Sequence, residues 1–363
     1  MNKRAIDTLS SDLVAARDHF SRITGGLDGD RLLGPKLAIV NPPLWEIGHV
    51  GWFQEHWCLR WDEGKLTPSI LPGADKLYDS SNVAHDTRWD LPLPNLDATR
   101  NYLANVLERT LDRLAKEPEN ERLRYFVALC TLHEDMHAEA LHYTQQTLGY
   151  PDPAGTTTAA HIPAADLSFP RATIRLGAER REDRFVFDNE KWAHDVDVAP
   201  FDIAPHPVTN AQYMEYVDLG GKAPRYWQEV DGAWHERRFD RLQPLEPKAP
   251  VRHVSWDEAN AYCKWAGRRL PSEAEWVRAA GKMEWGDVWE WTSSPFAPFS
   301  GFSADPYADY SQPWFNTHKV LKGASFATPR RLVHPQFRNF FVAERGDVFS
   351  GFRTCAQSKM STT

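Results

Sequence analysis

Residues 121–148 read ERLRYFVALCTLHEDMHAEALHYTQQTL, and Gly149 and Pro151 follow them closely. Helices commonly end at a glycine with a proline shortly after it, so the stretch predicts one long helix. His133 and His137 stand one helical turn apart in it, and both imidazoles therefore project from the same face. Such a helix could deliver two ligands for a metal ion rigidly.

The face that carries this histidine pair is otherwise largely apolar. It comprises, at alternating spacings of four and three, Phe126, Cys130, His133, His137 and Ala140. This seam should point into the protein, where a single histidine is usually just a hydrogen-bonded core residue. Two histidines in register favour a metal site instead, and Glu134, Asp135 and Glu139 are candidate acceptors for their ring N–H groups.

Three further amphipathic segments precede this helix. Apolar residues at spacings of three and four predict a helix over residues 6–20, and a leucine series predicts another over residues 103–114. The segment NPPLWEIGHVGWFQEHWCLRW, residues 41–61, predicts a helix with Asn41 as its cap and Pro42 at its first position. Four helices indicate a bundle, which we expect to occupy residues 1–150.

The rest of the chain differs in character, and 363 residues exceed the usual size of one domain. Residues 151–170 are rich in Pro, Ala and Thr, lack a periodic apolar stripe, and are expected to form a linker. The next segment combines β-like runs at 185–190 and 195–203 with one helix around 256–265 and long connections. An irregular, loop-rich α+β domain is therefore predicted over residues 171–356, followed by a C-terminal tail over residues 357–363.

Composition excludes several classes of function. The net charge is -8 without a basic run, which argues against a nucleic-acid-binding protein. The first 20 residues interrupt their apolar positions with charges, so they lack the apolar core of a signal peptide or a membrane span. Four cysteines without a CxxC pair fit reduced thiols better than a disulfide framework. We therefore expect a cytoplasmic protein with neither a membrane nor a nucleic-acid partner.

A metal site with open positions needs a third ligand beside the histidine pair. His49 and His56 are seven residues apart, so they share a helix face and their spacing does not choose between them. His49 is favoured because Gly48 beside it lets a neighbouring helix or a ligand approach closely. His56 is expected to be partly exposed near the helix end, where its positive form is favoured.

The sequence HEDMH, residues 133–137, also matches the H-E-x-x-H pattern of zinc peptidases. The metzincin continuation of that pattern is absent, because Ala140 and Tyr143 stand in place of its glycine and its last histidine. Three histidines suit zinc and iron alike, so the ligands alone do not choose the metal. A zinc hydrolase or thiol transferase, and a non-catalytic ligand-binding module, stay open as alternatives.

Five motifs in the second half of the chain carry a family resemblance. In chain order they are VTNAQY (208–213), VSWDEANAYCKWAGRRLPSEAEW (254–276), WGDVWEWTSSPF (285–296), LKGASFAT (321–328) and GFR (351–353). Together they resemble the sulfatase-modifying-factor domain of formylglycine-generating enzymes and sulfoxide synthases, which implies a C-type-lectin-like fold. The terminal cysteine pair of copper-dependent formylglycine generators is not matched, since only Cys355 lies there.

The first 150 residues resemble a DinB-type bundle, and the combination of the two is similar to the ergothioneine-type sulfoxide synthases. The resemblance implies that His49, His133 and His137 hold iron(II), which selects iron over zinc and His49 over His56. It also implies that dioxygen couples a sulfur or selenium donor to hercynine, a trimethylated histidine. The downstream domain is then expected to complete the substrate pocket.

The implied contacts to hercynine lie in FRNFF, residues 337–341, where Asn339 could orient the ligand and Phe340 and Phe341 offer aromatic faces for a quaternary ammonium group. Met136 stands where ergothioneine enzymes often carry a glutamine near hercynine. Phe341 stands where several carry an acid that recognises the amino group of γ-glutamylcysteine. Amino-acid thiols therefore fit less well, and the chain most resembles the branch that joins hercynine to a selenosugar.

The resemblance leaves the donor site and the proton donor to be assigned. The residues expected to line a polar, aromatic donor site are Arg88, Trp89, Arg330 and Arg331. A second branch of the family has paired tyrosines where this chain has Ser81 and Asn82. Tyr307 and Tyr310, just after the GDVWEWT motif, are therefore the expected proton donors.

Overall fold

The computed structural model describes residues 3–62, 64–155, 159–162 and 164–357. The chain divides into two compact units, Met1–Gly155 and Thr156–Thr363. The tail expected over residues 357–363 lies outside the described residues, except for Gln357. None of the described helices combines the length and apolarity that crossing a bilayer requires.

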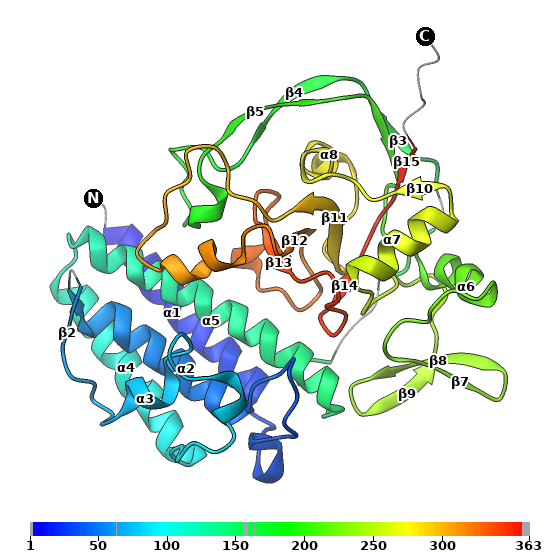
Figure 1. Ribbon diagram of the computed structural model, residues 1–363. Helices are drawn as coiled ribbons and strands as arrows, with labels where there is room; N and C mark the ends of the chain where they lie inside the picture. Colours follow the sequence, from blue (N-terminus) through cyan, green and yellow to red (C-terminus); the bar gives the residue numbers. More distant parts are fainter. Residues whose placement is uncertain (1–2, 63, 156–158, 163, 358–363) are drawn as a thin grey trace. The chain divides into compact units, whose positions relative to one another are not determined.

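The first unit is a helical bundle. Its elements are α1 (Lys3–Thr24), η1 (Gly29–Leu32), α2 (Pro43–Glu55), η2 (His56–Arg60), β1 (Trp61–Asp62), β2 (Lys65–Leu66), α3 (Ala74–Tyr78), η3 (His85–Thr87), α4 (Leu96–Lys116) and α5 (Glu121–Leu148). Helix α1 packs against α5, and α2 packs against both α4 and α5. Figure 1 shows these four long helices side by side, which confirms the predicted bundle.

The helix ends follow from local chemistry. Helix α5 occupies the predicted range: the Asn120 side chain accepts a hydrogen bond from the Leu123 N–H at its start, and Gly149 caps its end at φ 69°. Helix α2 begins one residue later than predicted, with Pro42 as the N-cap and Pro43 inside the helix. The physical reason is Pro43, because a proline disfavours the helical conformation in the residue before it.

The second unit is built from short strands and long connections. Its elements are β3 (Leu167–Phe169), β4 (Ala172–Leu176), η4 (Asp188–Glu190), β5 (His194–Val198), β6 (Phe201–Ile203), α6 (Asn210–Asp218), β7 (Trp227–Val230), β8 (Ala233–Arg238), β9 (Arg241–Pro244), α7 (Trp256–Trp265), β10 (Arg268–Arg269), α8 (Glu273–Ala279), η5 (Ala280–Lys282), β11 (Trp289–Pro295), η6 (Ala308–Tyr310), η7 (Gln312–Trp314), β12 (Lys319–Gly323), η8 (Arg330–Leu332), β13 (Asn339–Phe341), β14 (Ser350–Gly351) and β15 (Cys355–Ala356).

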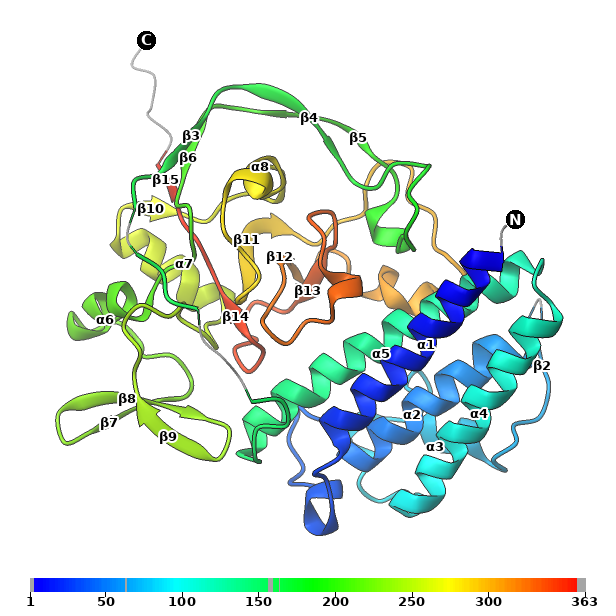
Figure 2. The same ribbon diagram turned by 180° about the vertical axis from the view of Figure 1, so that it is seen from behind.

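Two four-stranded sheets organise this unit, with strand orders β10-β15-β6-β3 and β13-β12-β11-β14. Strand β11 runs antiparallel to β12 and parallel to β14. The β4–β5 pair and the β7-β8-β9 meander form separate small sheets, and Figure 2 shows them lying outside the two main ones. The predicted irregular α+β character of this domain is confirmed.

The sequence motifs of this unit include the starts of its helices. Helices α6, α7 and α8 each begin with a capping box. In α8, for example, the Ser272 hydroxyl accepts from the Glu275 N–H, and the Glu275 carboxylate accepts from the Ser272 N–H. The helix predicted around residues 256–265 is confirmed as α7.

A buried ion pair joins three of the motifs. Arg353 from GFR and Glu290 from GDVWEW are fully buried and form a bidentate pair, and the Trp276 indole N–H also donates to Glu290 at 2.8 Å. Trp276 in turn lies in an apolar cluster with Phe169, Val198, Phe201 and Ile203. Motifs far apart in the sequence are therefore parts of one core.

Two predictions about this unit need correction. Residues 185–190 form no strand, because the Phe187 N–H donates to the Glu190 carboxylate and residues Asp188–Glu190 make a 3-10 turn. Strand β3 lies within residues 151–170, which were expected to be a linker without regular structure, and pairs antiparallel with β6. The run at 195–203 does contain strands, namely the main part of β5 and all of β6.

His161, another residue of the expected linker, is held by two carboxylates. Its Nε2 lies 2.9 Å from Asp287 Oδ2, its Nδ1 lies 3.4 Å from Glu284 Oε2, and its ring stacks on His206. The hydrogen bond and charge of Asp287 outweigh burial and raise the pKa of His161. A group whose pKa is raised by folding stabilises the folded state below its unfolded pKa and loses that contribution as pH rises through the folded value.

We therefore expect His161→Asn to lower the free energy of unfolding more at pH 5.5, below the ordinary pKa of histidine of about 6.5, than at pH 9. Urea unfolding of wild type and variant at both pH values measures this difference. A matched control is His235→Asn, because His235 contacts the Ala233 carbonyl oxygen and pairs with no carboxylate in the described part of the chain. An equal loss at both pH values would show that His161 contributes packing only.

Candidate metal centre

Three histidine side chains meet inside the first unit. His133 and His137 project from α5 and His49 from α2, and one potential ligand atom of each lies within 4.8 Å of the others. The Nε2 atoms of His133 and His137 are 3.2 Å apart, and the His49 ring centroid lies 5.2 Å and 4.9 Å from theirs. Among the described residues, this is the cluster whose donor set could hold a metal ion.

The outer nitrogen atoms of two of these rings are already engaged. His49 Nδ1 lies 2.8 Å from the Tyr78 carbonyl oxygen, and His137 Nδ1 lies 2.8 Å from Glu46 Oε1. A carbonyl and a carboxylate only accept hydrogen bonds, so both Nδ1 atoms carry a proton, and in the neutral form of each ring Nε2 keeps a lone pair. The rings therefore present metal-binding atoms toward one another.

Burial keeps the histidines in the form that binds metals. Desolvation, with a contribution from the neighbouring histidines, lowers the pKa of His49 to about 3 and that of His133 well below its ordinary value. The His133 ring also stacks on Phe53, with 3.6 Å between centroids. Because metals bind neutral imidazole, the lowered pKa values of His49 and His133 fit a divalent transition metal.

A close contact at Gly48 explains how His49 is placed. A Cβ atom at Gly48 would lie 2.3 Å from ring carbons of Tyr78, so the tyrosine ring fills the space that glycine leaves. Tyr78 ends α3 and offers the backbone carbonyl that holds His49. The approach that the sequence predicted at Gly48 is thus made by Tyr78.

His56 lies outside the cluster. It begins η2, a π-turn at the end of α2, and its side chain is half-buried. The expectation that its positive form is favoured is wrong, because burial lowers the pKa of His56. Its ring lies against Trp52, with centroids 5.1 Å apart, and its Nδ1 has no hydrogen-bond partner among the described residues.

Of the predicted acceptors for the histidines, Glu134 is engaged elsewhere. Glu134 forms a bidentate pair with Arg17, at 2.5 Å and 3.2 Å, and that pair extends to Gln54. Glu46 of α2 supplies the acceptor for His137 instead. The signal was present in the sequence, since Glu46 precedes His49 by three residues and shares its helix face.

Arg88 and Met136, both expected at the substrate, also lie in the first unit. Arg88 is buried beside the cluster: its guanidinium sits over the Trp45 ring at 3.9 Å, and Trp45 stacks on His49. It donates to Asn41 Oδ1 at 2.7 Å. Met136 is half-buried on α5, next to His137 in the chain.

The other expected substrate residues belong to the second unit. Phe340 of β13 stacks on Phe296 with centroids 4.0 Å apart, and its ring edge meets Tyr310 at 5.9 Å. Phe341 is covered by Arg345 at 5.1 Å. Neighbouring residues in a strand face opposite sides, so Phe340 and Phe341 do not share one aromatic cage.

The remaining residues expected at the substrate differ in burial and in their partners. The Asn339 side chain accepts from the Phe340 N–H at 2.9 Å, whereas Arg330 is exposed in η8. Tyr307 and Tyr310 lie 6.1 Å apart, centroid to centroid, and Tyr310 stacks on Phe187. Burial and nearby carboxylates raise the pKa of Tyr310 well above its ordinary value, so the phenol keeps its proton at neutral pH.

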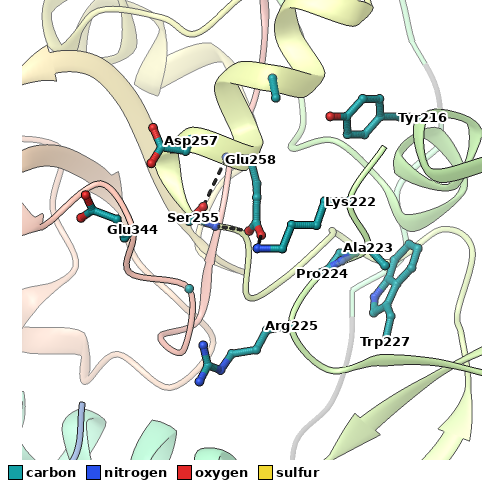
Figure 3. Close-up of a pocket in the computed structure, with 12 residues that line it drawn as sticks. Tyr216, Lys222, Ala223, Pro224, Arg225, Trp227, Ser255, Asp257, Glu258 and Glu344 are labelled. Carbon is teal, nitrogen blue, oxygen red and sulfur yellow. Dashed lines mark hydrogen bonds and ion pairs between the residues drawn. The ribbon is translucent and has the colours of Figure 1, made fainter. Parts of the chain in front are cut away.

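A pocket of about 650 Å³ in the second unit lies apart from these residues. Its walls come from α7 and from the loop before β7, and the Lys222–Glu258 ion pair crosses it at 2.6 Å (Figure 3). Glu344 and Asp257 lie on one side and Trp227 on the other. None of the expected site residues lines it.

Comparison with known proteins finds a matching family for each of the two units. Residues 12–141 match the DinB superfamily, and residues 163–285 and 283–358 match the sulfatase-modifying factor enzyme 1-like domain. The chain is 31% identical to a hercynine oxygenase of Mycolicibacterium smegmatis and 30% identical to one of Mycobacterium tuberculosis, in each case over 96% of this chain and 98% of the relative. It is 25% identical to ergothioneine biosynthesis protein 1 of Schizosaccharomyces pombe, over 87% of this chain and 52% of that protein.

Proposed function

Because this chain belongs to the hercynine oxygenase family, in which a DinB bundle precedes a sulfatase-modifying-factor domain, we propose that it joins hercynine to a selenosugar with iron(II) and dioxygen. Membership makes the chain an oxygen-dependent oxidoreductase of the ergothioneine-type sulfoxide synthases. In the proposed reaction the imidazole C2–H and the Se–H bonds break and a C–Se bond forms. Dioxygen accepts the electrons, placing one oxygen atom on selenium and releasing the other as water.

The proposed metal ligands are His49, His133 and His137. The proximity of the three rings and the engaged outer nitrogens of His49 and His137 support this assignment. Bound iron(II) would supply the one-electron redox chemistry that activation of dioxygen requires and that zinc lacks. Three ligands leave coordination positions open for substrates.

The choice of a selenosugar as donor depends on one observation at Phe341. The family resemblance places an acid here to bind the amino group of γ-glutamylcysteine. In this chain the position carries an aromatic ring covered by the Arg345 guanidinium, which is paired with Asp347, so neither the ring nor the guanidinium offers an ammonium group the acceptor it needs. A neutral sugar donor does not need the missing acid.

We also propose roles for the tyrosines and for the residues that would contact hercynine. Tyr310 keeps its phenolic proton and is the proposed proton donor, with Tyr307 as its neighbour. The Phe340 ring provides a face for the trimethylammonium group of hercynine, and Asn339 beside it orients the ligand. The hercynine contact from the first unit is proposed for Met136.

The arginines complete the proposed donor contacts. Arg88 keeps an Nε–H group without a hydrogen-bond partner among the described residues, so it can donate one more hydrogen bond to an oxygen atom of the donor. Arg330 is exposed and offers a second cationic group.

A second candidate is an ergothioneine-type synthase that uses cysteine or γ-glutamylcysteine. The relatives favour it, since proteins named for hercynine and ergothioneine align with most of this chain. The two candidates share the metal centre and hercynine, and they differ only in the donor.

Product analysis separates the candidates. Purified full-length protein loaded with iron(II) is given hercynine and an equimolar mixture of a selenosugar, cysteine and γ-glutamylcysteine, in air and without oxygen. We expect mass spectrometry to find mainly the selenium product, and only in air. The same assay with Tyr310→Phe and Tyr307→Phe is expected to show the larger loss of product for Tyr310→Phe.

Each other outcome has a defined meaning. Preferential use of γ-glutamylcysteine would reject the selenosugar and favour the second candidate. Stoichiometric zinc, with activity that does not depend on oxygen, would instead favour a hydrolase or thiol transferase. A protein that retains no metal would favour a ligand-binding module.

A further inference from the structure

We propose that Glu46 is a positioning residue that fixes the His137 ring and makes His137 a stronger metal ligand than His49. The inference depends on the proposed function only in requiring that the cluster take a divalent metal. It concerns the first unit alone.

The unequal partners of the histidines carry the argument. His137 Nδ1 donates to a carboxylate, Glu46 Oε1, at 2.8 Å, whereas His49 Nδ1 donates to a neutral backbone carbonyl at the same distance. A hydrogen bond to an ionised acceptor is about twice as strong as one to a neutral acceptor. A carboxylate behind a histidine also fixes the ring orientation and raises the basicity of the nitrogen that faces the metal.

Helix geometry makes Glu46 suited to this task. It lies one turn before His49 on α2, so the same helix provides one ligand and the partner of a ligand on α5. Its side chain is only 3% exposed, so solvent does little to screen its charge. Glu134 cannot replace it, since Arg17 occupies that carboxylate.

A second layer holds Glu46 in place. The Asn41 amide donates to Glu46 Oε2 at 3.4 Å, and Asn41 Oδ1 accepts from Arg88 at 2.7 Å. The Arg88 guanidinium lies over Trp45, which stacks on His49 at 5.0 Å. Asn41 thus links the buried Glu46 carboxylate to the buried Arg88 guanidinium and fixes the position of both.

The test is metal binding by the Glu46→Gln variant of the full chain. Glutamine keeps the shape and can still accept from His137, so the variant removes the charge and leaves the packing. We expect cobalt(II), and iron(II) without oxygen, to bind the metal-free variant about 10–100-fold more weakly than wild type in calorimetric titrations. The visible absorption bands of the cobalt form should also shift, since a weaker donor changes the ligand field.

Glu55→Gln is the matched control. Glu55 is an equally buried carboxylate of α2, but it accepts from Ser69, Ile70 and Tyr102. This variant should lower the unfolding temperature of the metal-free protein and leave cobalt affinity unchanged. Glu46→Gln should instead weaken cobalt binding and leave the unfolding temperature of the metal-free protein nearly unchanged.

The outcomes keep this inference separate from the proposed function. Wild-type protein that binds neither metal would reject both. If wild type binds and Glu46→Gln binds equally well with an unchanged cobalt spectrum, the positioning role is wrong and the synthase proposal stands. Should Glu46→Gln fail to fold, Asn41→Ala tests the same layer: weaker cobalt binding supports the role, and unchanged binding rejects it.

Discussion

A His133→Ala variant is expected to lose its bound metal and the oxygen-dependent reaction, whereas His56→Ala should keep both. His133 Nε2 lies 3.2 Å from His137 Nε2 in the three-ring cluster, and His56 takes no part in that cluster. Removing a direct ligand should weaken metal binding by more than the roughly 10–100-fold that loss of an outer partner costs. Elemental analysis after dialysis of the iron-loaded proteins measures the metal retained.

The two substitutions form a matched pair, since each removes an imidazole that packs against aromatic rings in the same unit. His133→Ala will also leave a void beside Phe53, so the folded state of both variants should be checked by circular dichroism. Retention of metal by His133→Ala together with its loss from His56→Ala would reverse the ligand assignment.

An Arg353→Met variant is expected to lose about 3–5 kcal/mol of stability, because it leaves the Glu290 charge buried without its partner. Both side chains are fully buried, and Arg353 also donates to the Ala204 and Glu284 carbonyl oxygens. A loss of this size approaches the whole stability of many domains. Urea unfolding of wild type and variant, monitored by tryptophan fluorescence, measures this loss of stability.

The double variant Arg353→Met with Glu290→Leu tests the cause. It should recover part of the loss, because no buried charge remains, although the Trp276 N–H loses its acceptor. Arg268→Met is the surface control: its pair with Asp166 is partly exposed on both sides, and such pairs contribute about 0–1 kcal/mol. A double variant as unstable as Arg353→Met would show that the ion pair is not the cause.

Local signals predicted much of the fold. The limits of α5 follow from Asn120 and Gly149, residues that satisfy free backbone groups or adopt a left-handed turn whatever surrounds them. The helices of the second unit likewise begin at capping boxes readable in the sequence. The strand predicted over residues 185–190 was wrong. A β-like pattern does not reveal that the Glu190 carboxylate will accept a hydrogen bond from the nearby Phe187 N–H.

Partners across the bundle could not be predicted in the same way. Glu134 adjoins His133 in the sequence, yet it is Arg17, 117 positions away, that takes its carboxylate. Glu46 reaches His137 over 91 positions because α2 packs on α5. Sequence spacing describes one helix at a time, whereas these contacts depend on which faces of two helices meet.

The three histidines of the cluster also depend partly on sequence spacing and partly on tertiary contacts. The sequence by itself determined that His133 and His137 share a helix face, because a period of 3.6 residues places positions four apart on one side. Helix spacing alone left His49 and His56 equivalent, since seven residues separate them by almost two whole turns, and Gly48 and the family resemblance favoured His49. Only the tertiary structure shows how the two differ: α2 ends in a π-turn at His56, while the Tyr78 ring packs into the space at Gly48 and its carbonyl holds His49 beside the pair.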